Sequence, residues 1–116
     1  MEFDRPKGIY QQIADHVCRR ILEREWPPGE RIPSVREMAV TMGVNPNTVA
    51  RSYQALLDGV IIENRRGIGY FVSPSAQEKI MNEMRREFIG DELPRLFDTM
   101  KRIGMEMDEL ITLYND

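Results

Sequence analysis

The sequence predicts a mainly α-helical fold with one small β-hairpin, and three observations support this prediction. Apolar residues recur at three- and four-residue spacing in several segments, as they do on amphipathic helices. Two short runs rich in β-branched and aromatic residues flank a turn that contains Gly67. Proline, glycine and asparagine mark sharp turns between the helical segments. Residues 28–72 therefore predict helix, tight turn, capped helix and hairpin, the outline of a winged helix-turn-helix.

The first predicted helix is amphipathic. Its apolar residues fall at helical spacing and are Ile9, Tyr10, Ile13, Val17, Ile21 and Leu22. The segment Trp26-Pro27-Pro28-Gly29 ends this helix, because proline cannot continue a helix and glycine permits the turn. Its polar face is expected to carry Arg19, Arg20 and Arg24.

The second predicted helix begins after Ser34. The run Ser34-Val35-Arg36-Glu37 has the capping-box pattern, in which the Ser34 hydroxyl accepts from the Glu37 amide and the Glu37 carboxylate bonds back. Gly43 stands where the residue after a helix usually needs a positive φ. The residues expected to face inward are Val35, Met38 and Ala39.

A third helix is predicted directly after Asn45. Asn45 suits the N-cap, and Pro46 suits the first helical position because the amide there has no partner in a helix. Asp58-Gly59 is expected to end this helix, whose buried stripe is Val49, Tyr53, Leu56 and Leu57. About four residues separate the second and third helices, which is the spacing of a helix-turn-helix.

The hairpin is predicted from Val60–Glu63 and Ile68–Val72, with a turn at residues 64–67. Ser73-Pro74-Ser75 then breaks the pattern and is taken as a module boundary. Residues 1–73 are therefore expected to form one domain and residues 74–116 a helical tail.

The tail has an apolar seam. Ile80, Met84 and Phe88 fall at four-residue spacing, and Gly90-Asp91 punctuates the pattern. Later apolar residues repeat in steps of three and four for about three heptads, which indicates one helix that packs on other helices along its length. Phe97, Gly104 and Ile111 widen the seam. The residues predicted to form a dimer interface are Phe88, Leu93, Leu96, Phe97, Met100, Ile103, Met107, Leu110 and Tyr114.

Composition excludes several protein classes. The 116 residues are 41% hydrophobic and 30% charged, as in ordinary soluble globular proteins. No apolar run has the length of a bilayer-spanning helix, and the N-terminal MEFDRPKG lacks the apolar core of a signal peptide. The single cysteine, Cys18, allows no internal disulfide, so a cytoplasmic location is expected.

The net charge of −3 is unevenly distributed along the chain. Residues 1–73 hold ten Lys/Arg and nine Asp/Glu, whereas residues 74–116 hold six against ten. Five arginines between Arg31 and Gly69 are accompanied only by Glu37, Asp58 and Glu63. The acidity therefore lies in the tail, and the helix-turn-helix is locally basic.

The first two turns of a helix in a major groove present outward side chains to base edges, and here these are Asn45, Asn47, Thr48 and Arg51. Asn47 pairs well with adenine, Arg51 with guanine, and the Thr48 methyl with thymine. Arg31 and Arg36 suit phosphates, and the hairpin tip suits phosphates or a minor groove. The complete candidate set is Arg31, Ser34, Arg36, Asn45, Asn47, Thr48, Arg51, Arg65, Arg66 and Gly67.

Structural roles compete with these assignments. Asn45 can serve only as an N-cap, Thr48 and Tyr53 can simply pack, and exposed arginines are ordinarily solvated. His16 is expected at a solvated or core-edge position, because no cysteine–histidine cluster has zinc spacing. The sequence contains no glycine-rich phosphate cradle and no serine–histidine–acid set, so neither an enzyme nor a cofactor is predicted.

Four segments together resemble the gluconate-repressor (GntR) family of bacterial transcription regulators. They are residues 9–13, 28–39, 44–49 and 67–72, within a match over residues 8–73. The Asn-Pro-Asn-Thr-Val run and the short tail are most similar to the YtrA-type subfamily. That resemblance implies two C-terminal helices that form a homodimer, no large ligand domain, and often a transporter operon as target.

The resemblance also implies DNA contacts from Arg36, from Asn45, Asn47 and Thr48, and from residues 65–67. Many relatives have arginine where this chain has Pro46 and Ala50. Arg51 is one residue further on, which turns it by about 100° around the helix.

The sequence thus predicts a homodimeric DNA-binding repressor on an inverted repeat with half-sites near one helical turn apart. An effector is not predicted, although a tail groove lined by Phe88, Phe97 and methionines competes as an apolar ligand site with dimer packing. Two alternatives remain. One is a winged-helix protein-interaction module that does not bind DNA, and the other is an enzyme or the detached head of an aminotransferase-fused relative.

Overall fold

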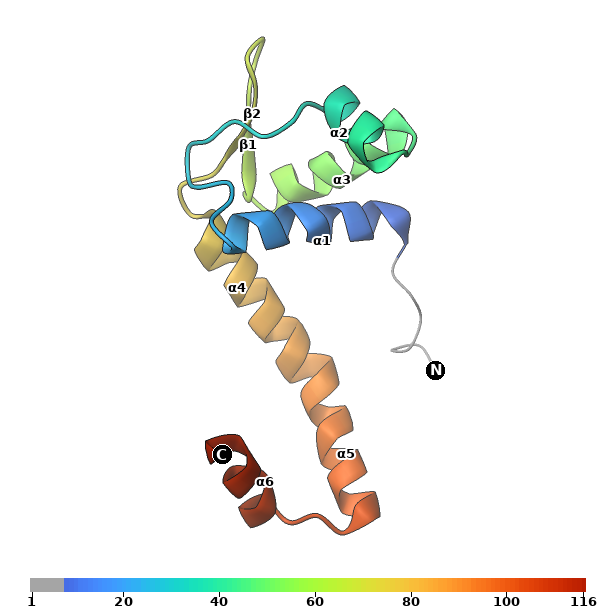
Figure 1. The fold of residues 1–116 in the computed structure, drawn as a ribbon, viewed down its shortest axis with the longest axis vertical. Helices are drawn as coiled ribbons and strands as arrows, with labels where there is room; N and C mark the ends of the chain where they lie inside the picture. Colours follow the sequence, from blue (N-terminus) through green and yellow to red (C-terminus); the bar gives the residue numbers. More distant parts are fainter. Residues whose placement is uncertain (1–7) are drawn as a thin grey trace. The chain divides into compact units, whose positions relative to one another are not determined.

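The structure is a computed structural model that describes residues 8–116 (Figure 1). The charged N-terminal segment used in the signal-peptide argument, residues 1–7, lies outside the described residues. The chain divides into a first compact unit that ends at Asn82 and a second unit, Glu83–Asp116. Within residues 8–116, no helix has the length and apolarity needed to cross a bilayer.

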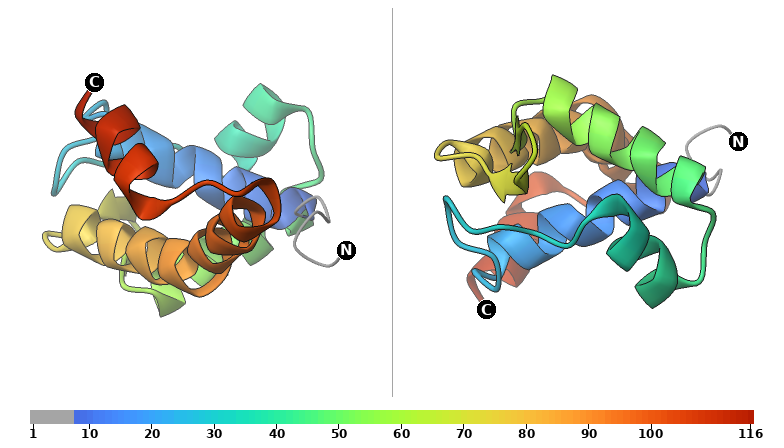
Figure 2. Two further views of the ribbon diagram at one scale, coloured as in Figure 1. Left: turned by 90° about the horizontal axis from the view of Figure 1, so that it is seen from below. Right: turned by 90° about the horizontal axis from the view of Figure 1, so that it is seen from above.

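The first unit confirms the predicted fold class and element order. It contains helices α1 (Ile9–Leu22), α2 (Val35–Met42) and α3 (Pro46–Asp58), followed by strands β1 (Ile62–Arg65) and β2 (Gly69–Val72). Helix α4 (Ala76–Glu87) begins in this unit. Helices α1 and α3 pack against each other, and the right-hand view in Figure 2 shows them crossing at an angle.

The core of the first unit is built from one apolar stripe on each helix. Ile13, Val17 and Ile21 of α1 are fully buried, and α2, α3 and the hairpin contribute Met38, Ala39, Val49, Tyr53, Leu56, Ile62 and Val72. Ala76 and Ile80 of α4 lie in the same core. The two compact units therefore divide after Asn82, whereas the sequence suggested a module boundary at Ser73-Pro74-Ser75.

The predicted caps of α2 and α3 are confirmed. The Ser34 hydroxyl accepts from the Glu37 amide at 3.1 Å, and the Ser34 amide donates to the Glu37 carboxylate at 2.9 Å. Gly43 ends α2 with a φ of 66°. The Asn45 side chain accepts from the Asn47 amide at 2.7 Å and starts α3. These local bonds set the sharp turn between the two helices.

The hairpin is present, but the predicted start of its first strand at Val60 is wrong. Val60 has a φ of 57° and belongs to the turn that ends α3, where the Ile61 amide donates to the Leu56 carbonyl at 2.9 Å. Strand β1 therefore begins at Ile62 and pairs antiparallel with β2. The second strand begins at Gly69, because the Ile68 amide closes the turn onto the Arg65 carbonyl at 2.8 Å.

The segment before α2 lies along the free edge of β2. The Ile32 amide donates to the Tyr70 carbonyl, and the Val72 amide donates to the Glu30 carbonyl, both at 2.9 Å. Arg31 is thereby paired with Phe71. This pairing fixes the hairpin to the loop that leads into the helix-turn-helix.

Tyr53 links α3 to the loop that precedes α2 and to strand β2 of the hairpin. Its hydroxyl donates to the Pro33 carbonyl at 2.7 Å, and its ring meets the Tyr70 ring edge-on at a centroid distance of 5.0 Å. The side chain is buried, and burial raises the pKa of the Tyr53 hydroxyl, so the group stays protonated and donates. The expected packing role of Tyr53 is confirmed.

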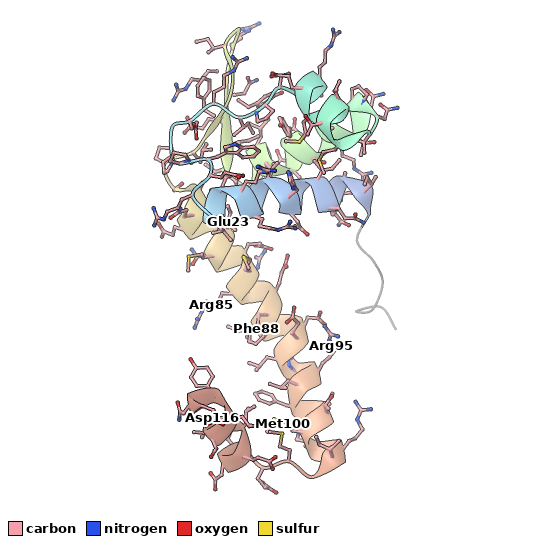
Figure 3. The ribbon with its side chains drawn as sticks, in the orientation of Figure 1. Glu23, Arg85, Phe88, Arg95, Met100 and Asp116 are labelled. Carbon is pink, nitrogen blue, oxygen red and sulfur yellow. The ribbon has the colours of Figure 1, made fainter. Side chains whose placement is uncertain are left out.

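The second unit consists of the end of α4, a π-helical turn η2 (Phe88–Glu92), α5 (Leu93–Ile103) and α6 (Met107–Asn115). Gly90-Asp91 does not break the helix but widens it into the π turn. The predicted single helix over the apolar seam is wrong, because Gly104 has a φ of 75° and ends α5. Figure 3 shows Met100 between α5 and α6, and Met100 is buried within the unit.

Replacing Tyr53 with phenylalanine tests the link that Tyr53 makes. Tyr53→Phe keeps the ring but leaves the Pro33 carbonyl without its donor, so we expect the free energy of unfolding to fall by about 1–3 kcal/mol. Urea denaturation at fixed protein concentration measures this change. Tyr10→Phe is the matched control, because the Tyr10 hydroxyl makes no hydrogen bond within residues 8–116. Equal stability of the two variants would contradict the assignment.

Candidate nucleic-acid interface

Helix α3 presents a polar edge to solvent. Asn45, Asn47 and Arg51 are exposed there, and Thr48 is half-buried. The opposite side of the helix packs on the core of the first unit. Ser52 on that side donates from its hydroxyl to the Tyr10 carbonyl at 2.7 Å. The fold thus leaves the predicted base-contacting residues of α3 on an accessible surface.

Sequence analysis missed one residue on this edge. Gln54 is exposed and donates from its amide to the Asp58 carboxylate at 2.9 Å. It lies seven residues after Asn47 and three after Arg51, so it shares their helix face. Extending the helical spacing by one turn would have identified it. A glutamine amide pairs with adenine in the same two-bond manner as asparagine.

The two predicted contact residues at the N-terminal end of α2, Arg36 and Ser34, differ in how accessible their side chains are. Arg36 is exposed, as a phosphate contact requires. Ser34 is half-buried, and both its hydroxyl and its amide are engaged in the capping box with Glu37. These bonds from Ser34, with a smaller effect of the Arg31 charge, lower the pKa of the Glu37 carboxyl.

One face of the hairpin carries two guanidinium groups. Arg65 is opposite Gly69 across the strands, and Arg31 pairs with Phe71 on the other edge of β2. The Arg65 Cζ atom lies over the Phe71 ring, 4.0 Å from its centroid. We call this surface, made of Arg31, Arg65, Gly69 and Phe71, the wing face.

Gly69 allows Arg31 to cross the wing face. A Cβ atom at residue 69 would lie 2.9 Å from the Arg31 Nε atom, closer than real side-chain contacts allow. The Gly69 φ of 142° also disfavours any other residue. The absence of a side chain therefore places the Arg31 guanidinium beside β2. This contact could not be predicted from the sequence, because no helical or strand periodicity relates residues 31 and 69.

The hairpin tip is exposed. Arg66 and Gly67 project at the turn, and Gly67 has a φ of 76° that glycine accommodates without strain. Ile68 beside them is 61% exposed. The predicted tip residues therefore lie together on an accessible loop next to the wing face.

Among the described residues, the arginines of the interface are not engaged in close ion pairs, although the exposed Glu37 carboxyl lies near enough to Arg31 to feel its charge. Within residues 8–116, none of the interface arginines forms an ion pair with a carboxylate: Arg31, Arg36, Arg51, Arg65 and Arg66. The same part of the chain has no group of three or more His, Cys, Asp or Glu side chains that could hold a metal ion. Unneutralised guanidinium groups around a polar helix edge suit an anionic backbone flanking hydrogen-bonding base edges.

The residues predicted for dimerisation lie in the second unit, and most are exposed. Phe88, Leu96, Phe97, Ile103, Met107 and Tyr114 are exposed, whereas Leu93 and Leu110 are half-buried. Met100 packs inside its own chain (Figure 3). The unit thus carries a large apolar surface that its own residues do not cover.

Comparisons with known proteins agree on one family. The model of the bacterial regulatory proteins of the gntR family matches residues 9–72. The chain is 37% identical to the uncharacterized HTH-type transcriptional regulator YhcF of Bacillus subtilis, over 95% of this chain and 89% of that protein. It is 34% identical to the HTH-type transcriptional repressor YtrA of Bacillus subtilis, over 88% of this chain and 78% of that protein.

A solved structure shares the whole fold. The putative transcriptional regulator of the GntR family from Bacteroides thetaiotaomicron is 39% identical, with a TM-score of 0.83. The similarity covers 93% of this chain and 94% of that one. The likeness therefore extends beyond the helix-turn-helix into the helical tail.

Loss of a wing-face guanidinium should weaken DNA binding without changing sequence preference. We expect Arg31→Ala and Arg65→Ala each to lower the affinity for any duplex. Each variant should also reduce the slope of log K against log salt concentration by about 0.9, because each loses one phosphate contact. Fluorescence anisotropy across a salt series measures the slope. Arg19→Ala, on the exposed side of α1, is the control. An unchanged slope for Arg31→Ala and Arg65→Ala would exclude phosphate contacts there.

Proposed function

The chain belongs to the gntR family of bacterial regulatory proteins, and on that premise we propose that it represses transcription as a homodimer bound to an inverted-repeat operator. It is a DNA-binding transcriptional regulator, and the family to which it belongs comprises regulators, not enzymes. The observation that carries the proposal is the exposed polar edge of α3 flanked by unneutralised arginines.

In the proposal, α3 enters the major groove and its polar edge contacts bases. The Asn47 side chain is exposed and pairs with adenine, and the Thr48 methyl touches a thymine methyl. The Asn45 side-chain oxygen accepts the N-cap bond from the Asn47 amide, so its NH₂ group is the part fully available to a base. Gln54 extends the contacts by one helical turn.

Phosphate contacts set the position of α3 in the groove. Arg36 at the start of α2 and Arg31 on the wing face lie on either side of the Ser34 cap and contact the backbone. Arg65 and Arg66 extend from the hairpin toward phosphates or the minor groove, with Gly67 allowing close approach. We assign Ser34 a supporting role, because its hydrogen bonds orient the first turn of α2.

A second copy of the chain covers the exposed apolar surface of the tail. Ile103 is 69% exposed and Tyr114 is 88% exposed, and burying such side chains against the same surface of a partner is favourable. A two-fold dimer presents two α3 helices in opposite directions along DNA, so each half-site is the inverse of the other. Residues 1–73 form the DNA-binding domain in this proposal, and residues 74–116 the dimerisation tail.

Repression is the expected direction of regulation. The relative from Bacillus subtilis named YtrA is a transcriptional repressor and is matched over most of its length. A dimer seated on an operator excludes other proteins from the same duplex. We place the protein in the bacterial cytoplasm, with double-stranded DNA as its partner and a transporter operon as the expected kind of target.

Selection of genomic DNA fragments by the purified protein tests the function directly. We expect the enriched fragments to share an inverted repeat with half-site centres about 10 base pairs, or a multiple of one helical turn, apart. Asn47→Ala should bind the enriched duplex about 1–3 kcal/mol more weakly, and mainly at one adenine position. Enrichment of no common sequence would reject the proposal.

Substitution of charged residues into the apolar surface of the tail tests the proposed dimer. The double variant Leu96→Glu, Ile103→Glu should sediment as a monomer, because a dimer would bury unpaired carboxylates. Arg102→Glu introduces a carboxylate on the side of α5 opposite Leu96, Phe97 and Ile103, and this variant should remain dimeric. A persistent dimer in the double variant would place the interface on another surface.

A further inference from the structure

The Arg51 side chain on the exposed edge of α3 has an aromatic partner on α1. Its Cζ atom lies over the Tyr10 ring, 3.9 Å from the ring centroid. At this distance the guanidinium is in contact with the π face, an attractive cation–π arrangement. The two residues are far apart in sequence, and their contact joins α3 to the first turn of α1.

The position of Tyr10 is fixed by the backbone of its own helix. The Ser52 hydroxyl, which is fully buried, is 2.7 Å from the Tyr10 carbonyl and 3.1 Å from the Thr48 carbonyl. Ile13, in the next turn of α1, is fully buried in the core. The first turn of α1 is therefore anchored against α3, which holds the Tyr10 backbone next to Arg51.

The stack leaves the hydrogen-bonding capacity of Arg51 available. A guanidinium stacked by its face keeps its N–H groups in the plane of the group, directed away from the ring. Within residues 8–116, Arg51 makes no hydrogen bond or ion pair with another residue. The side chain is thus ordered by an interaction that does not use its donors.

Arg51 is the only residue of α3 suited to guanine. The sequence of α3, PNTVARSYQALLD, contains one arginine, and its other exposed polar edge residues are neutral. Arg51 is turned by about 100° from Ala50, which directs it toward α1. A flexible arginine in this place would lose its rotamer freedom on binding a base, at a cost in affinity.

We propose that Tyr10 is a positioning residue that holds the Arg51 guanidinium in one orientation for two-bond recognition of a guanine. This inference rests on the proposed DNA-binding function and names a specificity determinant within it. Tyr10 itself need not touch DNA. Removing its ring frees Arg51 to sample other rotamers, which lowers selectivity for the operator while the positive charge remains.

A double-mutant cycle on the full chain tests the proposal. The probes are the duplex that the wild-type protein enriches from genomic DNA and a scrambled duplex of equal length and composition. We expect Tyr10→Leu to weaken binding to the enriched duplex about 3- to 10-fold and to leave the scrambled duplex within about twofold. In the Arg51→Ala background, Tyr10→Leu should have no further effect, because the group it positions is absent.

Two further variants separate positioning from folding. Tyr10→Phe keeps the π face and should bind as the wild type does. Arg51→Lys keeps the charge but loses the planar stack and the two-bond geometry, so it should lose selectivity as Arg51→Ala does. If Tyr10→Leu fails to fold, equal selectivity of Arg51→Lys and wild type still overturns the proposal.

The outcomes distinguish the inference from the function on which it rests. Equal losses from Tyr10→Leu in the wild-type and Arg51→Ala backgrounds would show a purely structural role and overturn the inference. Unchanged selectivity in Tyr10→Leu would also overturn it, while the regulator function stands. If the wild-type chain enriches no duplex, the proposed function fails and this inference fails with it.

Discussion

The hydrogen bond from the Tyr53 hydroxyl to the Pro33 carbonyl sets the placement of the recognition helix. It ties α3 to the residue just before the Ser34 cap, and the Tyr53 ring packs on Tyr70 of the hairpin. In the proposed function the helix-turn-helix and the hairpin contact one duplex together, so fixing their relative positions before DNA binds lowers the cost of binding. A single buried aromatic residue with one polar atom provides this link, because burial keeps the hydroxyl a donor at every physiological pH.

This arrangement separates folding from recognition along a single helix. Val49, Ser52, Tyr53 and Leu56 occupy the inner side of α3, while Asn47, Arg51 and Gln54 occupy the outer side. Outer residues can therefore change with the operator at little cost in stability. Arg51 is the exception, since its guanidinium also contacts Tyr10 of α1. The Arg51 orientation therefore depends on how α1 packs, and the base contact proposed for Arg51 would depend on the same packing.

Features set by neighbouring residues were predictable from the sequence, and features set by distant ones were not. The caps at Ser34, Gly43 and Asn45 follow from local chemistry, and the structure has all three. Val60 was misassigned to a strand, because no propensity rule favours valine at a positive φ. The break between α5 and α6 at Gly104 was not predicted, because the apolar spacing of the tail continues across it and does not distinguish one helix from two. The contacts of Arg31 with β2 and of Arg51 with Tyr10 join segments that no spacing relates.

In the proposed function, the charge distribution leaves the exposed arginines as the main attraction to DNA. Residues 74–116 hold ten acidic and six basic side chains, so the tail repels a polyanion at low salt. Residues 1–73 hold ten basic and nine acidic side chains, and the near balance gives weak non-specific attraction. If the proposed contacts are made, affinity depends on bringing the wing face, Arg36 and the outer side of α3 to phosphates and bases at the same time. Such a protein gains selectivity from geometry, because a duplex that matches only the charge binds it poorly.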